Sequence, residues 1–209
     1  GVEGTVFGNG SALVVGSDAS TSTGNSLSVG ASGVLSATNE CVFINAYASN
    51  VDNAGQITGD DGIVIQGNQV GTQTTIVNSG SIISSGLAGS DTGIGHFGSE
   101  KLVVTNTGLI KGVALSFNGE FGGGISEITN SGTMTGNVVL GAGDDLYDGR
   151  LGVIYGKVFG NEGLDILRGG AGADRLTGGG GADTFLFIKG DQTEIIRDYD
   201  DLIDTLQIL

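Results

Sequence analysis

The sequence predicts an all-β fold in which a right-handed parallel β-solenoid runs into a tighter parallel β-roll. Two observations favour this: the 209 residues include 42 glycines and no proline, and two kinds of short internal repeat follow one another. Each repeat is too short to bury its own apolar face, whereas stacked copies bury a continuous core. We therefore expect a solenoid at 1–139, a β-roll at 140–190 and a C-terminal capping segment at 191–209.

The N-terminal repeat consists of a short strand, an Asn-x-Gly turn, a second strand and then a further apolar strand. Its clearest copies read VDNAGQITG at 51–59, IVNSGSIIS at 76–84, VTNTGLIKG at 104–112 and ITNSGTMTG at 128–136. Asn and Gly tolerate the left-handed backbone that such a turn needs. Stacked copies would place the turn asparagines in a ladder that satisfies their amides. The segment GLAGSDTGIGHFGSEK at 86–101 is expected to leave the stack as a loop.

From residue 140 the period tightens to nine residues. Copies in register read LGAGDDLYD at 140–148, GNEGLDILR at 160–168, GGAGADRLT at 169–177 and GGGGADTFL at 178–186. Position four is always glycine, position eight is always large and apolar, and position six is an aspartate in every copy: Asp145, Asp165, Asp174 and Asp183. The intervening GRLGVIYGK at 149–157 resembles a decayed copy with Ile154 in the aspartate position.

One carboxylate in each glycine-rich turn is a pattern that suits a hard divalent cation, which takes six to eight oxygen ligands. Two nine-residue units complete one coil, so turns on the same side are 18 residues apart. Asp165 and Asp183 are then expected to face one ion, and Asp145 and Asp165, 20 residues apart, a second one. Asp174 belongs to the opposite side, with its downstream neighbour near Asp191. Backbone oxygens, which glycine turns leave unshielded, are expected from Gly160, Glu162, Leu164, Gly169, Ala171, Gly178 and Gly180.

These copies resemble the RTX, or hemolysin-type calcium-binding, nonapeptide repeat G-G-x-G-x-D-x-U-x, over about residues 140–190. The tail DTFLFIKGDQTEIIRDYDDLIDTLQIL resembles the segment that closes such arrays in secreted RTX metalloproteases and lipases. The resemblance implies Ca²⁺ as the bound ion, a bacterial origin and type I secretion. It also implies a chain that stays unfolded in a calcium-poor cytosol and folds outside the cell. We expect the weak affinity of extracellular modules, with a dissociation constant of roughly 10⁻⁴–10⁻³ M.

Composition excludes several other classes. With 23 acidic and 8 basic residues, the net charge of −15 provides no basic surface for nucleic acid. No run of 18 apolar residues predicts a membrane span, and a lone Cys41 cannot form an internal disulfide. The sequence as given does not open on a charged and then apolar signal segment. Repulsion among the carboxylates would oppose folding until a cation binds, which fits a secreted protein that folds on calcium.

Catalytic residues are not expected. Residues 1–139 contain only two basic residues, Lys101 and Lys111, and a single histidine, His96, which we expect at the surface of a glycine-rich loop. Cys41 begins an apolar strand and is expected to pack in the core. Two alternatives stay open at this stage. The solenoid face would serve an adhesin or carbohydrate-binding module that contacts a glycan or cell surface, or the chain is a fragment of a polysaccharide-active enzyme. The oligomeric state also stays open.

Overall fold

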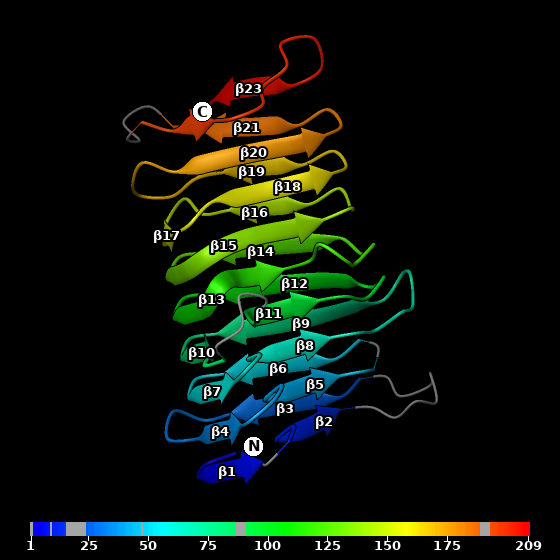
Figure 1. Ribbon diagram of the computed structural model, residues 1–209, viewed down its shortest axis with the longest axis vertical. Helices are drawn as coiled ribbons and strands as arrows, with labels where there is room; N and C mark the ends of the chain where they lie inside the picture. The colour runs from blue at the N-terminus through cyan, green and yellow to red at the C-terminus, as the bar shows by residue number, and fades with distance from the viewer. Residues whose placement is uncertain (1, 9, 16–23, 47, 87–90, 189–192) are drawn as a thin grey trace.

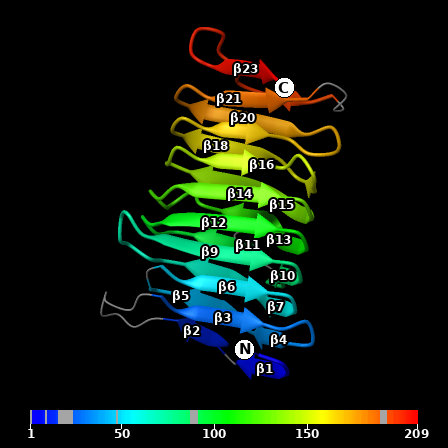
Figure 2. The same ribbon diagram turned by 180° about the vertical axis from the view of Figure 1, so that it is seen from behind.

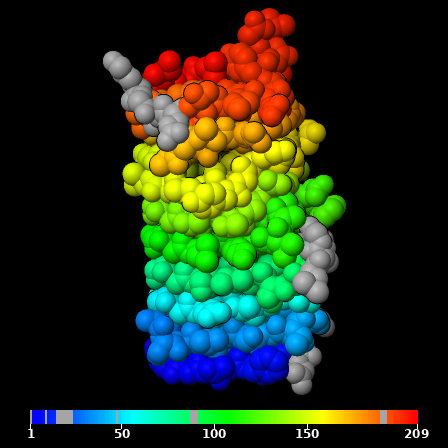
Figure 3. All heavy atoms as spheres, turned by 60° about the vertical axis from the view of Figure 1, so that its left-hand side comes forward, coloured from blue at the N-terminus to red at the C-terminus, as the bar shows by residue number. Residues whose placement is uncertain are grey.

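The computed structural model describes residues 2–8, 10–15, 24–46, 48–86, 91–188 and 193–209. The strands form an elongated stack of rungs, with the N-terminus at one end and the C-terminus at the other (Figure 1). Every strand pair in the two sheets is parallel, and the described residues contain no α-helix. Sequence order is kept along the long axis, so each rung lies between its neighbours in the chain (Figure 3). The prediction of an all-β parallel solenoid is confirmed.

One face of the stack is a nine-stranded sheet, to which each rung contributes one strand (Figure 2). In chain order its strands are β3 (Ser26–Val29), β6 (Asn50–Asn53), β9 (Gln73–Asn78), β12 (Lys101–Asn106), β14 (Ser126–Asn130), β16 (Leu146–Asp148), β19 (Ile166–Arg168), β21 (Thr184–Phe187) and β23 (Thr205–Ile208).

The second sheet is larger because each N-terminal rung crosses it twice. The first crossing is made by β1 (Thr5–Gly8), β4 (Val34–Ala37), β7 (Gln56–Gly59), β10 (Ser81–Ser84) and β17 (Val153–Tyr155). The second crossing is made by β2 (Leu13–Val15), β5 (Val42–Ile44), β8 (Ile63–Ile65), β11 (Thr92–His96), β18 (Val158–Glu162), β20 (Arg175–Gly180) and β22 (Ile195–Ile196). Two long strands run through both crossings, β13 (Leu109–Asn118) and β15 (Thr133–Gly141).

The nonapeptide segment changes the rung from three strand segments to two. After β19 each rung consists of one strand in each sheet, because nine residues hold one turn and one strand. Residues 149–162 still follow the older plan, with β17 beside the first part of β15 and β18 beside its second part. Ile154 therefore pairs with Met134 within a strand and is 8% exposed. It is a core residue and not a turn residue, so the interpretation of 149–157 as a decayed nonapeptide is corrected.

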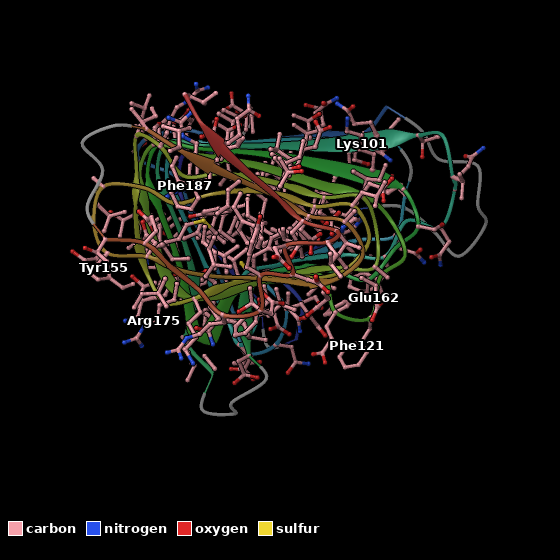
Figure 4. All side chains as sticks on the ribbon, turned by 90° about the horizontal axis from the view of Figure 1, so that it is seen from above. Lys101, Phe121, Tyr155, Glu162, Arg175 and Phe187 are labelled. Carbon is pink, nitrogen blue, oxygen red and sulfur yellow. The ribbon has the colours of Figure 1, made fainter. Side chains whose placement is uncertain are left out.

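The core fills the space between the two sheets (Figure 4). Alternation along the strands decides which residues enter it: in β12 the buried positions are Leu102, Val104 and Asn106. Branched apolar side chains suit such half-buried strands. Each nonapeptide buries its position-eight side chain, namely Tyr147, Leu167, Leu176 and Phe185.

The expected asparagine ladder is present at the turn between the two sheets. The amide nitrogen of each side chain donates to the amide oxygen of the next, from Asn53 to Asn78 at 2.7 Å, from Asn78 to Asn106 at 2.7 Å and from Asn106 to Asn130 at 2.8 Å. All four residues are buried. The ladder thus holds four successive rungs in register without any charged group.

Two expectations for the N-terminal part were wrong. Residues 92–96 do not leave the stack, because β11 pairs with β8 and β13 and supplies the third segment of its rung. His96 is consequently fully buried rather than exposed. Its two ring nitrogens lie 3.0 Å from the Ser126 hydroxyl and 3.0 Å from the Glu100 carbonyl oxygen, which makes burial of the ring tolerable. Cys41 is buried, as predicted.

Candidate calcium site

Three of the four nonapeptide aspartates stack in one column. Asp145, Asp165 and Asp183 each stand immediately before a strand of the nine-stranded sheet, at the corner marked by Glu162 in Figure 4. The Asp145 amide N–H donates to Asp165 Oδ1 at 2.9 Å, and the Asp165 N–H donates to Asp183 Oδ1 at 3.0 Å. The spacings of 20 and 18 residues therefore bring the expected pairs together, and we call this set the aspartate column.

The second oxygen of each carboxylate has no donor. All three side chains are 1% exposed, and the Oδ2 atoms of Asp145, Asp165 and Asp183 are buried without a hydrogen-bond partner among the described residues. A buried, unpaired carboxylate oxygen costs several kcal/mol unless it gains a cation or a proton. The column therefore presents unsatisfied negative oxygens at regular intervals.

Burial raises the pKa values of these carboxyl groups. Desolvation is the main cause in each case and takes the pKa of Asp145 and of Asp165 to about 7. Hydrogen bonds from backbone amides oppose the shift, whereas nearby carboxylates add to it. The pKa of Asp183 is raised for the same main reason, with Asp204 and Asp198 as the neighbouring charges. Bound cations would reverse this balance by favouring the ionised form.

Glycines make room for the carboxylates. A Cβ at Gly160 would collide with Asp165 Oδ2 and with the carbonyl oxygen of Gly178, and a Cβ at Gly178 would collide with Asp183 Oδ2. Two position-four glycines at this corner have positive φ, +131° at Gly163 and +130° at Gly181, which other residues rarely adopt. The carboxylate oxygen and the backbone carbonyl of the next rung thus face the same small space, as a site for a hard cation requires.

Five of the expected carbonyl ligands belong to this corner, and those of Gly169 and Ala171 belong to the opposite one. Gly160 and Glu162 lie in β18, and Gly178 and Gly180 lie in β20 one rung further on. Leu164 lies in the turn, where its N–H donates to Asp144 Oδ1 at 2.9 Å. The Glu162 side chain extends over Gly180, so this residue brings a carboxylate as well as a carbonyl to the corner.

Asp174 belongs to the opposite corner, as expected. Its Oδ2 accepts from the Gly170 N–H at 2.7 Å, and its own N–H donates to Glu194 Oε2 at 3.1 Å. Gly169 lies between these two carboxylates, close to an oxygen of each. The downstream neighbour that the structure describes is thus Glu194, while Asp191 lies outside the described residues. On the upstream side, the Ala171 N–H donates to the Gly152 carbonyl in a turn without a carboxylate at that position.

Three acidic residues of the tail take part in the array, although sequence reasoning did not single them out: Asp198, Asp204 and Glu194. Asp204 Oδ1 accepts from the Asp183 N–H at 2.9 Å and so extends the aspartate column by one rung. Asp198 accepts from the N–H groups of Gly178 and Gly179, at 3.0 and 2.7 Å. A signal for Asp204 was available, since DTFLF at 183–187 recurs as DTLQI at 204–208.

Among the described residues, no three His, Cys, Asp or Glu side chains gather as a metal-binding group. An ion at the aspartate column therefore needs backbone carbonyls as well as carboxylates. The groove lined by Gln73, Ser99 and Lys101 has no acid or base for proton transfer except Lys101, which pairs with Glu127 at 2.6 Å. The described residues also contain no helix long and apolar enough to cross a membrane.

Comparison with known proteins agrees with this geometry. Residues 158–186 match the family model of the RTX calcium-binding nonapeptide repeat (4 copies). No curated protein and no solved structure matches the chain. The matched residues span β18 to β21, including Asp165, Asp174 and Asp183. This segment of the β-solenoid therefore belongs to the RTX calcium-binding nonapeptide repeat family, whose members bind Ca²⁺.

Proposed function

We propose that the chain is the calcium-binding structural module of a secreted bacterial RTX-type protein, and that its β-roll folds when it meets calcium outside the cell. The observation that carries the proposal is that the buried Oδ2 atoms of Asp145, Asp165 and Asp183 have no donor among the residues that the structure describes. Each such atom destabilises the calcium-free roll, and each becomes a ligand once an ion is present.

We assign the ligands by position in the stack. Asp165 and Asp183 would bind one ion with the carbonyls of Gly160, Glu162, Leu164, Gly178 and Gly180, and Asp145 with Asp165 a second. Asp174, with Gly169, Ala171 and Glu194, would form a site on the opposite corner. The ion neutralises carboxylates that otherwise repel one another, and the chain's own turns supply uncharged oxygens that complete its shell.

The same features support folding outside the cell and a structural role. The cytosol is poor in calcium, so a chain with these uncompensated carboxylates would stay unfolded there and fold at millimolar calcium. The lone Cys41 is buried, and burial raises the pKa of its thiol to about 11, which leaves it unreactive. His96 is buried against Ser126 and Glu100, so it is not available as a base. These observations support a structural and not a catalytic function.

The test is a calcium titration of the chelator-treated chain followed by circular dichroism. We expect a cooperative rise of the β signal at submillimolar to millimolar calcium, and a much smaller response to magnesium, which keeps its own waters. Asp183→Ala should raise the calcium midpoint. Asp52→Ala is the matched control, because Asp52 is exposed in β6, remote from the column. A spectrum that is already native in chelator and unchanged by calcium would refute the proposal.

A further inference from the structure

The boundary between the two repeat types is also a change in hydrogen-bond chemistry. Ser126 holds the position in its rung that Asp145, Asp165 and Asp183 hold in the following rungs, since Ser126 N–H donates to Asp145 Oδ1 at 2.6 Å in the same pattern. Its hydroxyl lies 3.0 Å from His96 Nδ1 and 3.4 Å from the Leu140 carbonyl oxygen. A hydroxyl can therefore donate to the carbonyl that it faces.

The next rungs replace this donor with an acceptor. Asp165 Oδ2 faces the same small space as the Gly178 carbonyl oxygen, as the Ser126 hydroxyl faces the Leu140 carbonyl. Two acceptors that face each other cannot form a hydrogen bond, so they need a cation or a proton between them. Ser126 and Asp145 hold equivalent positions in successive rungs. The corner is thus hydrogen-bonded without an ion at Ser126, whereas it depends on an ion from Asp145 onward.

Rungs before this boundary contain no buried carboxylate oxygen without a partner. Among the described residues up to 139, the buried side-chain atoms that lack a hydrogen-bond partner are Ser49 Oγ and Asn53 Oδ1, and both belong to uncharged groups. Even the buried Glu100 carboxylate accepts from Thr74 Oγ1 at 3.1 Å and from Thr72 Oγ1 at 3.5 Å. The asparagine ladder is likewise made of groups that both donate and accept. Calcium is therefore not needed to neutralise any buried carboxylate oxygen in the described residues of this part.

The number of buried apolar side chains per residue falls at the same boundary between the two repeat types. The rung at 50–72 buries five apolar side chains, Val51, Ile57, Ile63, Val64 and Ile65. A nonapeptide buries one large apolar side chain, such as Leu167, for nine ordered residues. Apolar burial is the main term that offsets the entropy of ordering the backbone, and the nonapeptide has less of it for each residue that it orders. The N-terminal rungs thus have the larger apolar contribution per residue, and the roll has the greater need of ion binding.

We infer that the N-terminal solenoid, up to about residue 139, folds without calcium and serves as the template on which the calcium-dependent roll assembles. The inference rests on the proposed function for the roll, and adds that ion dependence begins at one rung. The edge of β14 and β15 would then offer preformed backbone groups to β16, β17 and β18, so the first roll rung adds to an existing sheet. Adding a strand to an existing edge avoids the cost of forming a new nucleus.

Hydrogen exchange of the full chain, read by mass spectrometry in chelator and in calcium, tests this directly. In chelator we expect protected amides in β6, β9, β12 and β14, and exchange-labile amides in β18 to β21. Calcium should protect both parts. If every rung exchanges freely in chelator, the template inference fails while calcium-dependent folding stands. If the roll is already protected in chelator, the proposed function fails together with the inference.

A variant tests whether the roll uses the template. Ser126→Ala removes the hydroxyl between His96 and the Leu140 carbonyl, and Thr129→Ala, at an exposed position of the same strand, is its control. We expect Ser126→Ala to lower protection of β12 and β14 in chelator and to raise the calcium concentration at which β18 to β21 become protected by several-fold. An unchanged calcium midpoint, with weakened β12 and β14, would overturn the template role.

Discussion

Replacing Asp165 by asparagine should change stability in opposite directions with and without calcium. Asparagine keeps the shape of the side chain and can still accept the Asp145 N–H through Oδ1. It removes the charge from the buried Oδ2 position, which has no hydrogen-bond partner in the part of the chain that the structure describes. The calcium-free variant should therefore be more stable than the parent, and the calcium-bound variant less stable.

The size of the calcium-free effect follows from the pKa. Folding raises the pKa of Asp165 from 3.8 to about 7, mainly by desolvation, and each unit corresponds to about 1.4 kcal/mol. The ionised group at pH 7.5 thus opposes folding by about 4 kcal/mol at most, and by roughly 2 kcal/mol once solvent near the turn screens it. A raised acid pKa lowers the stability of the fold at neutral pH, and this penalty is lost as the pH falls towards the unfolded value of 3.8, so the advantage of asparagine should vanish near pH 4.

The calcium-bound effect follows from linkage. At calcium well above the dissociation constant, each tenfold loss of affinity lowers stability by about 1.4 kcal/mol. Urea unfolding in about 10 mM calcium, some ten to a hundred times the expected dissociation constant, should show this loss. An osmolyte titration in chelator should show the gain, with Asp52→Asn as the control. Destabilisation of equal size in both conditions would refute the reasoning, since Asp165 would then act only as a hydrogen-bond acceptor.

Three further outcomes follow from the fold. Asn106→Ala removes one ladder member and leaves the Asn130 amide oxygen without its donor, so unfolding in calcium should show a loss of about 3 kcal/mol, against little for Thr129→Ala. Gly181→Ala requires φ near +130° and places Cβ against the Gly163 carbonyl; it should cost about 2 kcal/mol or more by the same assay, whereas Gly123→Ala, with open space around it, should not. Acid should partly replace calcium, because Asp145 protonates below about pH 7 in the fold; the β signal in chelator should be larger at pH 5 than at pH 8, and an unchanged signal would contradict this.

Periodicity in the sequence predicted most of the array. The 18- and 20-residue spacings placed Asp145, Asp165 and Asp183 in one column because a rung of fixed length returns the chain to the same corner. The asparagine ladder was predictable for the same reason. The glycines of the nonapeptide turns were expected to leave backbone oxygens unshielded, whereas the positive φ of Gly163 and Gly181 was not predicted. Where the repeat is regular, one-dimensional spacing determines three-dimensional neighbours.

The misses occurred where the period breaks. His96 belongs to a rung lengthened by an insertion, so its spacing gave no sign that β11 rejoins the stack. Ile154 was aligned by a nine-residue count in a rung that still has three strand segments. Asp198 and Glu194 lie in the tail, after the last regular nonapeptide. Because the tail does not keep the nine-residue period, the spacing of these residues does not predict which turns they contact. Only Asp204 repeated a readable motif, and it was overlooked because the copy lacks the preceding glycines.

The aspartate column also has a direction. Each carboxylate from Asp145 to Asp204 accepts, through Oδ1, the N–H of the rung before it, beginning with the N–H of Ser126. The Oδ2 atoms of Asp145, Asp165 and Asp183 have no hydrogen-bond partner among the described residues. An ion that fixes Asp165 therefore also fixes the backbone of the Asp145 turn, and removes part of the ordering entropy that a neighbouring ion would face. Sites in such a series share the cost of ordering, so calcium should fill them cooperatively and the roll should switch over a narrow range of concentration.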